Sequence, residues 1–415
     1  MTVTRSAVIS YHSSPLMEPG AGDAGGMTVY VRGLADALAR RGVHTDIFTR
    51  AIGDVPLVSS LSEGVRVISI QAGPRTTLDQ QSLRAHVDDF ADGIRAFAIA
   101  QRARYDVVHS HYWHSGLAAA TLADAWGVPL VHSHHTLGRV KNRFLAPGDT
   151  PEPVIRLDGE GRVIAAADVL VASTDEEWGH LSCLYGASHD RVKTLHPGVD
   201  HEVFHPGDRD AARDQLGIRD ELVVLFVARI QKLKGLDLAI AAVDELRSAL
   251  DRPIRLYVVG GPSGPGGDAE LARLEDLVRD RGLTDVVRFL GPQSHDHLPV
   301  FYRAADVLAV CSHSESFGLA ALEAQACGTP VVATAVGGLS HIVGDGESGF
   351  LVDTRDPSVF AARLKTLLSD DQLRGSFRRV AARRAKAFSW QRTGDALLEL
   401  YECLVGEQQP EVCTC

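Results

Sequence analysis

Two glutamates lie eight residues apart in the stretch SHSESFGLAALEAQACGTPVVA, which runs from 312 to 333. Glu315 follows an apolar run that we expect to be a strand. FGL (317–319) begins the next expected helix, whose free backbone amides can bind a phosphate. A carboxylate beside that phosphate needs neutral donors, such as sugar hydroxyls. Glu323 lies two turns inside the helix, where a charge without partners is costly and a ribose diol would supply two donors.

A second interpretation needs no ligand. Ser312 and Glu315 fit the S-x-x-E capping box, and Glu323 then lies on a solvated helix face. This explains each residue alone. It does not explain the cations and glycine loops found elsewhere in the chain.

Two cations follow another expected strand, in VARIQKLKG (227–235). Arg229 and Lys234 are five residues apart, so that a forked guanidinium and a mobile ammonium can reach one pyrophosphate. The alternative is a pair of solvated charges at the start of a helix. Because a helix N-terminus disfavours cations, the pattern favours a bound anion between them.

A glycine-rich loop follows the first expected strand. GAGDAG (20–25) matches the dinucleotide fingerprint, and Asp46 lies about twenty residues further on. The loop starts too far from its strand, however, and Asp46 falls at the start of the next strand rather than at its end. We therefore keep a nicotinamide-dependent oxidoreductase only as an alternative, beside a flexible surface loop. The favoured interpretation is that Gly25 and Gly26 open a helix whose N–H groups meet a phosphate.

The elements that position these residues form two similar halves. At 415 residues the chain is long enough for two domains. Short β-branched runs alternate with amphipathic stretches, which predicts parallel sheets covered by helices. The expected strands of the first half are 6–12, 44–50, 65–73, 106–112, 129–136, 169–173 and 191–198. Those of the second half are 222–230, 255–261, 286–291, 307–312, 330–336 and 349–353.

The predicted fold class is therefore α/β, with two Rossmann-like domains that face each other across a cleft. We place one domain at 1–198 and a second at 199–387, joined by a linker within 195–217 that carries two His-Pro-Gly turns. The stretch 388–406 is one more helix, which can cross back to the first domain. Ligands bind beyond the carboxyl ends of parallel strands, and the residues named above lie there.

Composition excludes several classes of partner. The net charge is −11 and the pI is near 5.9, so neither a nucleic acid nor an anionic membrane is expected. No apolar run reaches the length of a membrane span, and the N-terminus lacks a signal segment, so we expect a cytoplasmic protein. The six cysteines show no metal-ligand spacing, so no metal site is expected. Cys413 and Cys415 are expected in a frayed tail.

These motifs also carry a resemblance. HSSPLMEPGAGDAGGM, HSHYWHSG, HTLGRVKN, GDTPEP, GGPSG, FYRAAD and SESFGLAALEAQACGTPVVA closely resemble the retaining glycosyltransferases of family 4, of GT-B architecture and the mycothiol-pathway type. The resemblance covers nearly all of the chain, and it implies that 1–198 is the acceptor domain and 199–387 the nucleotide-sugar domain. It implies a metal-independent transferase with no cofactor beyond a GDP- or UDP-linked sugar, in which the departing diphosphate takes the acceptor's proton.

The resemblance also implies roles for single residues. The implied catalytic residues are His135, Glu315, Arg229 and Lys234, although His135 is also interpretable as a core histidine. The implied donor-binding residues are Gly25, Gly26, Arg229, Lys234, Glu315, Ser316, Phe317, Gly318, Leu319 and Glu323. The implied acceptor-binding residues are Thr28, Gln80, Tyr112, Thr136 and Arg156.

Two of the acceptor positions depart from the family pattern. Gln80 stands where the mycothiol enzymes have a lysine, and Thr28 where they have an asparagine. With one cation fewer, a carboxylate bound by Arg156 suits the subsite better than a phosphate dianion. We therefore expect a carboxylate-bearing acceptor, with GDP-octose transfer to the sulfur of ergothioneine in lincosamide biosynthesis as the leading example. UDP-N-acetylglucosamine transfer to inositol 1-phosphate is the alternative. Gln293 stands where some mycothiol enzymes have an arginine over the uracil, so the sequence permits either donor base.

A third hypothesis is a protein that binds sugar nucleotides without catalysis. Only a measurement of turnover distinguishes it from a transferase. A homodimer is compatible with the sequence, which specifies no oligomeric state.

Overall fold

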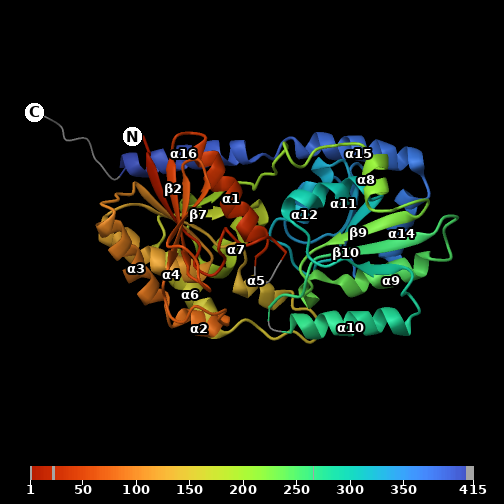
Figure 1. Cartoon of the computed structure of the whole chain (residues 1–415), viewed down its shortest axis with the longest axis horizontal. Helices are drawn as coiled ribbons and strands as arrows, with labels where there is room; N and C mark the ends of the chain where they lie inside the picture. Colours follow the sequence, from red (N-terminus) through yellow and green to blue (C-terminus); the bar gives the residue numbers. More distant parts are fainter. Residues whose placement is uncertain (1, 21–23, 265, 408–415) are drawn as a thin grey trace, which may run out of the picture.

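The computed structural model describes residues 2–20, 24–264 and 266–407, and the chain folds into two α/β units that lie side by side along its long axis (Figure 1). Each unit is a twisted sheet of mostly parallel strands with helices packed on it. Every strand expected from the sequence is present at its expected place. The α/β prediction with two Rossmann-like units is confirmed.

The first sheet has eight strands in the order β3-β4-β2-β1-β5-β6-β7-β8. Its strands are β1 (Arg5–Ile9), β2 (His44–Arg50), β3 (Val58–Ser62), β4 (Val65–Ile70), β5 (Val107–His111), β6 (Leu130–Ser133), β7 (Val169–Ala172) and β8 (Val192–Thr194). All pairs are parallel except β3 with β4. The sequence did not predict β3, because its segment VSSLS is short, polar and largely exposed at the sheet edge.

The second sheet has six parallel strands in the order β11-β10-β9-β12-β13-β14. They are β9 (Leu222–Val227), β10 (Ile254–Val259), β11 (Val287–Phe289), β12 (Val307–Val310), β13 (Val331–Thr334) and β14 (Gly349–Val352). This is the Rossmann order, in which strands are added first on one side of β9 and then, from β12 on, on its other side. The strand order therefore reverses between β9 and β12 in this sheet and between β1 and β5 in the first sheet.

Helices cover the faces of both sheets. Those of the first unit are α1 (Gly26–Ala39), α2 (Gln80–Arg84), α3 (Val87–Ala100), α4 (Trp113–Trp126), α5 (Gly138–Arg143), α6 (Val154–Ala166) and α7 (Asp175–Tyr185), with the 3-10 turn η1 (His189–Arg191). Those of the second are α8 (Arg209–Gln215), α9 (Leu236–Leu246), α10 (Gly267–Asp280), α11 (Leu298–Ala304), α12 (Leu319–Ala326), α13 (Leu339–Ile342), α14 (Pro357–Leu368) and α15 (Asp371–Ala385), with η2 (Lys232–Lys234) and η3 (His295–His297).

The last helix, α16 (Trp390–Glu407), runs back over the first unit, as Figure 1 shows in blue. Trp390 and Tyr401 are buried in one apolar cluster with Tyr30 of α1. The Tyr401 hydroxyl also lies 2.7 Å from Nδ1 of His109 on β5. The C-terminal helix therefore belongs to the core of the first unit.

The segment 195–217, which we interpreted as a linker, is more ordered than that. It contains α8, and Asp208 caps this helix by accepting a hydrogen bond from the amide of Ala211. Val199 and Phe204 are buried in the core of the second unit. The linker prediction is wrong for most of this stretch, because a helix too short to show amphipathic periodicity is recognisable only by its packing.

Candidate active site

A cavity of about 990 Å³ lies between the two units, at the carboxyl ends of both sheets. The predicted residues that line it from the first unit are Gly25, Gly26, Tyr112, His135, Thr136 and Arg156. Those from the second are Arg229, Lys234, Gln293, Glu315, Ser316, Phe317, Gly318, Leu319 and Glu323. The structure thus brings nearly all of the predicted donor and acceptor residues to one cavity, although the roles themselves stay predictions.

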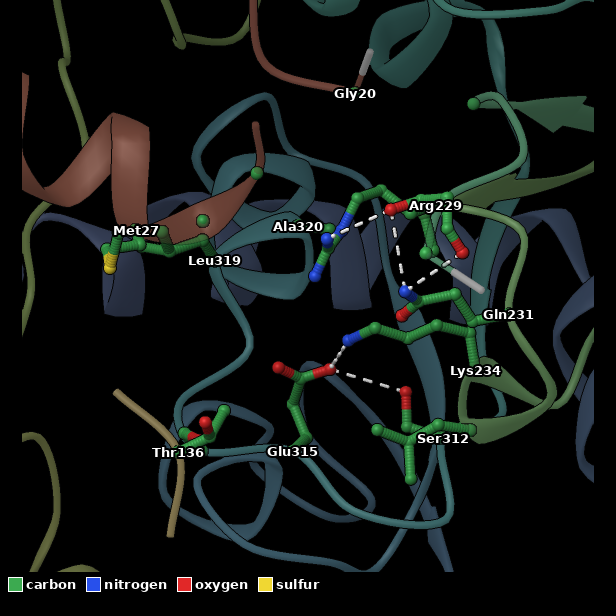
Figure 2. A pocket seen from close by; sticks show the side chains of 18 of the residues that line it. Gly20, Met27, Thr136, Arg229, Gln231, Lys234, Ser312, Glu315, Leu319 and Ala320 are labelled. Atoms are coloured by element: carbon green, nitrogen blue, oxygen red, sulfur yellow. Dashed lines mark hydrogen bonds and ion pairs between the residues drawn. The ribbon is translucent and has the colours of Figure 1, made fainter. Parts of the chain in front are cut away.

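Lys234 and Glu315 form an ion pair in this cavity. The lysine Nζ lies 2.6 Å from Oε2 of Glu315, and the Ser312 hydroxyl donates to the same oxygen at 3.3 Å (Figure 2). The helix that follows starts only at Leu319, with Gly318 as its N-cap, so Ser312 and Glu315 do not cap it. The capping-box alternative is therefore wrong. The Lys234–Glu315 ion pair instead faces the cavity, where a polar ligand can bind both groups.

The starts of α1 and α12 meet beside this pair. A Cβ atom on Gly26, the first residue of α1, would lie 3.5 Å from Cδ1 of Leu319, the first residue of α12. A Cβ atom on Gly25 would lie 3.1 Å from Nε of Arg229. Both helix N-termini, with their free amides and positive dipole ends, therefore converge near a guanidinium. This arrangement suits a diphosphate.

The backbone before α12 requires glycine. Gly318 has a φ of +101°, which L side chains rarely adopt, and a Cβ atom there would lie 2.7 Å from Cδ2 of Leu339. The chain can therefore turn from the loop of Glu315 into the helix of Glu323 within three residues. The position between the two glutamates therefore favours glycine.

Arg229 and its neighbours are held by the loop after β10. Nη1 of Arg229 donates to the Ser263 hydroxyl at 3.1 Å, and Nε2 of Gln231 donates to the Ser263 carbonyl at 3.3 Å (Figure 2). We did not single out Ser263 or Gln231 from the sequence. Ser263 lies in the GGPSG motif, which was the available signal.

Glu323 is 5% exposed and both of its carboxylate oxygens have protein donors. Nε2 of His295 donates to Oε1 at 2.8 Å, and the Tyr302 hydroxyl donates to Oε2 at 2.9 Å. Burial opposes the charged form of His295, but the Glu323 carboxylate outweighs it and raises the pKa of His295. Glu323 is therefore not the solvated helix residue of the second interpretation.

His135 connects the two walls of the cavity. Its backbone carbonyl accepts a hydrogen bond from the Ser316 hydroxyl of the second unit. Its ring Nε2 lies 2.9 Å from Nδ1 of His111, and its φ is +61°. Burial lowers the pKa of His135 to about 3, so the ring is neutral at pH 7. A neutral imidazole can hydrogen-bond a sugar hydroxyl without repelling the nearby cations.

The acceptor wall is centred on Arg156, which is 4% exposed. Its Nε lies 2.8 Å from Glu160 and its Nη1 lies 2.9 Å from Glu152, while Nη2 donates to the Thr136 hydroxyl at 3.0 Å. The guanidinium carbon also lies 5.2 Å from the centre of the Tyr112 ring. Two glutamates already balance the charge of Arg156. Less of its charge is therefore available to an acceptor carboxylate than we expected, and its role in binding the acceptor stays a prediction.

Of the other two acceptor predictions, only Thr28 can be placed, and it does not line the cavity. Thr28 is 1% exposed, and its hydroxyl lies 2.9 Å from that of Ser13, behind the lining. Gln80 is the first residue of α2, but its side chain lies outside the described residues, as do Cys413 and Cys415. Asp46 is buried between Arg5 at 2.7 Å and Arg66 at 2.8 Å, so its carboxylate is already paired and is not placed to hold a nicotinamide ribose.

Within residues 2–20, 24–264 and 266–407 there is no cluster of three or more His, Cys, Asp or Glu side chains that could hold a metal ion. Across these same residues, no helix combines the length and the apolar character needed to cross a membrane.

Comparison with known proteins matches both units. A model described as a glycosyl transferase 4-like domain covers residues 25–198, and one described as glycosyl transferases group 1 covers residues 208–384. The chain is 49% identical over 401 residues to D-inositol 3-phosphate glycosyltransferase of Mycobacteroides abscessus, which spans 96% of this chain and 88% of that protein. It is 48% identical over 414 residues to the enzyme of the same name from Acidothermus cellulolyticus, with 98% and 92% covered.

Solved structures agree. Sucrose-phosphate synthase from Thermosynechococcus elongatus superposes with a TM-score of 0.90 and 32% identity, over 97% of this chain and 100% of that one. The Anabaena HepE protein with UDP and glucose superposes with a TM-score of 0.76 at 20% identity, over 97% and 100%, which shows the shared fold. With two matched domain models, relatives near 48% identity and this cavity, the chain belongs to the family 4 glycosyltransferases of GT-B fold.

Proposed function

We propose that the chain transfers a sugar, with retention, from a nucleoside-diphosphate donor to an inositol monophosphate. The observation that carries the donor half is the meeting of two helix N-termini with Arg229 and Lys234 in one cavity. The acceptor half is supported by the relatives, which are named for D-inositol 3-phosphate and match nearly the whole chain. This was our alternative rather than our leading expectation.

The chemistry asks the protein mainly to stabilise a departing diphosphate. The bond between the anomeric carbon and the phosphate oxygen breaks, and a bond from that carbon to an acceptor hydroxyl oxygen forms on the same face. The hydroxyl proton passes to the departing phosphate oxygen. Negative charge that develops on the diphosphate is met by Arg229, by Lys234 and by the amides that start α1 and α12, which supply positive charge without a metal ion.

The Lys234–Glu315 pair has a second consequence for the donor. A diphosphate that binds Lys234 shares the cation with Glu315, which then turns free lone pairs toward the sugar hydroxyls. His135 lies on the opposite wall and is joined through Ser316 to the loop 312–318, which we call the donor loop. We propose that Glu315 and His135 hold the transferred sugar between the two units, and that Glu323 holds the ribose.

One observation still favours the carboxylate-bearing acceptor. Gln80 and Thr28 depart from the pattern of the family that the sequence resembles. The comparisons give the ergothioneine and lincosamide expectation no support. The ion pairs of Arg156 with Glu152 and Glu160 also weaken the argument that its charge selects a carboxylate. Transfer of a GDP-octose to ergothioneine therefore becomes the competing arm of the test. A cytoplasmic location and a homodimer stay predictions.

The test is a competition between acceptors. Purified enzyme is offered UDP-N-acetylglucosamine or a GDP-linked sugar with equal amounts of D-inositol 3-phosphate and ergothioneine, and the products are identified by mass spectrometry. We expect the inositol phosphate to be glycosylated faster. Faster glycosylation of ergothioneine would restore our first expectation, and binding of UDP without any turnover would favour a protein that binds sugar nucleotides without catalysis.

A further inference from the structure

The buried carboxylate of Glu323 has a fixed orientation. One lone pair of each oxygen is occupied by a protein donor, since Oε1 accepts from His295 at 2.8 Å and Oε2 accepts from Tyr302 at 2.9 Å. A carboxylate oxygen has two lone pairs, so each oxygen keeps one for a further donor. Two donors on two different oxygens stop the group from rotating about its terminal bond.

The two donors differ in their access to the cavity. Tyr302 of α11 is fully buried, whereas His295 of η3 lines the cavity together with Glu323. The His295 ring is itself held against Phe204, with ring centres 4.9 Å apart. A ring that packs on one side and donates to a carboxylate on the other has little freedom to move.

The charges around His295 favour this contact. The carboxylates of Glu323, on α12, and of Asp296, the next residue along η3, attract the protonated ring. Arg32, on α1 of the first unit, repels it. Tyr302 is neutral and donates its hydroxyl to the Glu323 carboxylate. The two carboxylates stabilise the protonated ring and outweigh burial and Arg32, which raises the pKa of His295.

We propose that His295 is a positioning residue for the donor: it holds Glu323 so that the free lone pairs of the carboxylate meet the ribose diol. The inference rests on the proposed function, in which Glu323 binds that ribose. His295 acts through Glu323 and needs no contact with the sugar. It links η3, which follows β11, to α12, which follows the donor loop.

The experiment measures binding by titration calorimetry. UDP and GDP are titrated into wild type, His295→Ala, His295→Asn and His295→Gln, and so are the 2′,3′-dideoxy counterparts, which lack the diol. Loss of a hydrogen-bond partner that orients a ligand-binding side chain typically costs about 10–100-fold in affinity, so we expect His295→Ala and His295→Asn to weaken binding of the better nucleotide by roughly tenfold. Binding of its dideoxy counterpart should be unchanged within about twofold, because the contact that His295 supports is already missing.

His295→Gln carries an amide donor of nearly the same reach and should restore ribonucleotide binding to within about threefold of wild type. His205→Gln is the matched control, since His205 is an exposed histidine of the same unit and should bind like wild type. Equal losses for the ribo- and dideoxynucleotides, or no loss with His295→Asn, would overturn the positioning role while leaving the proposed function intact. Failure of both UDP and GDP to bind wild type would instead overturn the proposed function and this inference with it.

Discussion

Acid should destabilise the first unit strongly, because burial holds six of its histidines neutral: His12, His109, His111, His132, His134 and His135. Burial lowers the pKa of His12 to about 4 and those of His109, His134 and His135 to about 3. It also lowers the pKa values of His111 and His132 well below their usual range. The unfolded chain protonates these rings near pH 6.5, whereas the folded chain does not. Stability is therefore lost as the pH falls below 6.5.

The size of the loss follows from proton linkage. Between pH 7.5 and 5.5, each such histidine lowers the free energy of unfolding by about 1.4 kcal/mol, so six contribute roughly 8 kcal/mol. Glu177 acts in the opposite direction, since burial raises its pKa to about 7 and acid relieves a buried charge. This returns about 2 kcal/mol over the same range. The net loss of roughly 6 kcal/mol is comparable to the whole stability of a typical domain.

Urea unfolding followed by tryptophan fluorescence tests this prediction. Trp113, Trp126 and Trp178 lie in the first unit, and Trp390 lies on α16 packed against it, so the signal reports that unit. We expect the midpoint to fall steeply from pH 7.5 to 5.5.

His134→Leu removes one titrating site and should reduce the pH-dependent loss by about 1.4 kcal/mol. His205→Gln, at an exposed position, should leave the pH dependence as in wild type. A free energy of unfolding that changed by less than about 2 kcal/mol between the two pH values would refute the reasoning, since it would mean that the buried rings are protonated in the folded protein.

Further predictions concern the donor loop and the acceptor wall. Lys234→Ala and Arg229→Ala should each lower kcat/KM by at least roughly 100-fold with the melting temperature nearly unchanged, and near-normal turnover of both would contradict their role at the diphosphate. Gly318→Ala should cost about 1–3 kcal/mol in thermal unfolding and weaken UDP binding, because of its positive φ; wild-type values for both would contradict the strain. Arg156→Ala leaves the buried Glu160 without its cation, with only the Gly138 amide and the Tyr185 hydroxyl as donors, and should cost about 3–5 kcal/mol of stability. A stable variant with only a raised acceptor KM would contradict the ion-pair network.

Local patterns were enough to predict most of the fold. Buried strands are recognisable from their β-branched runs, such as LVVLFV in β9. The turn at Gly318 is likewise recognisable from a short stretch of sequence, without the structure. The edge strand β3 and the helix α8 were missed because each is short and is specified by its packing. Tertiary contacts override weak local preference at such places.

The site shows the same division. Most of the lining residues that we predicted lie in loops that follow a strand, where parallel sheets bind ligands. Arg156 lies on α6 and was implied by the resemblance alone. The partners of these residues could not be predicted. Arg156 is paired with Glu152 and Glu160 across helix α6 and the loop before it, and His295 reaches Glu323 from 28 positions away. Charge counted along a sequence overestimates what a site offers to a ligand when buried carboxylates already neutralise its cations.

The most direct test of the account is the configuration of the product. Enzyme with UDP-N-acetylglucosamine and D-inositol 3-phosphate, in excess EDTA, is followed by proton NMR through the anomeric signal of the new linkage. We predict an α-linked product, because the acceptor attacks on the face from which the diphosphate departs. We also predict the full rate in EDTA, because Arg229, Lys234 and the two helix N-termini supply the charge that the departing diphosphate needs. A β-linked product, or a rate that EDTA abolishes and Mn²⁺ restores, would contradict it.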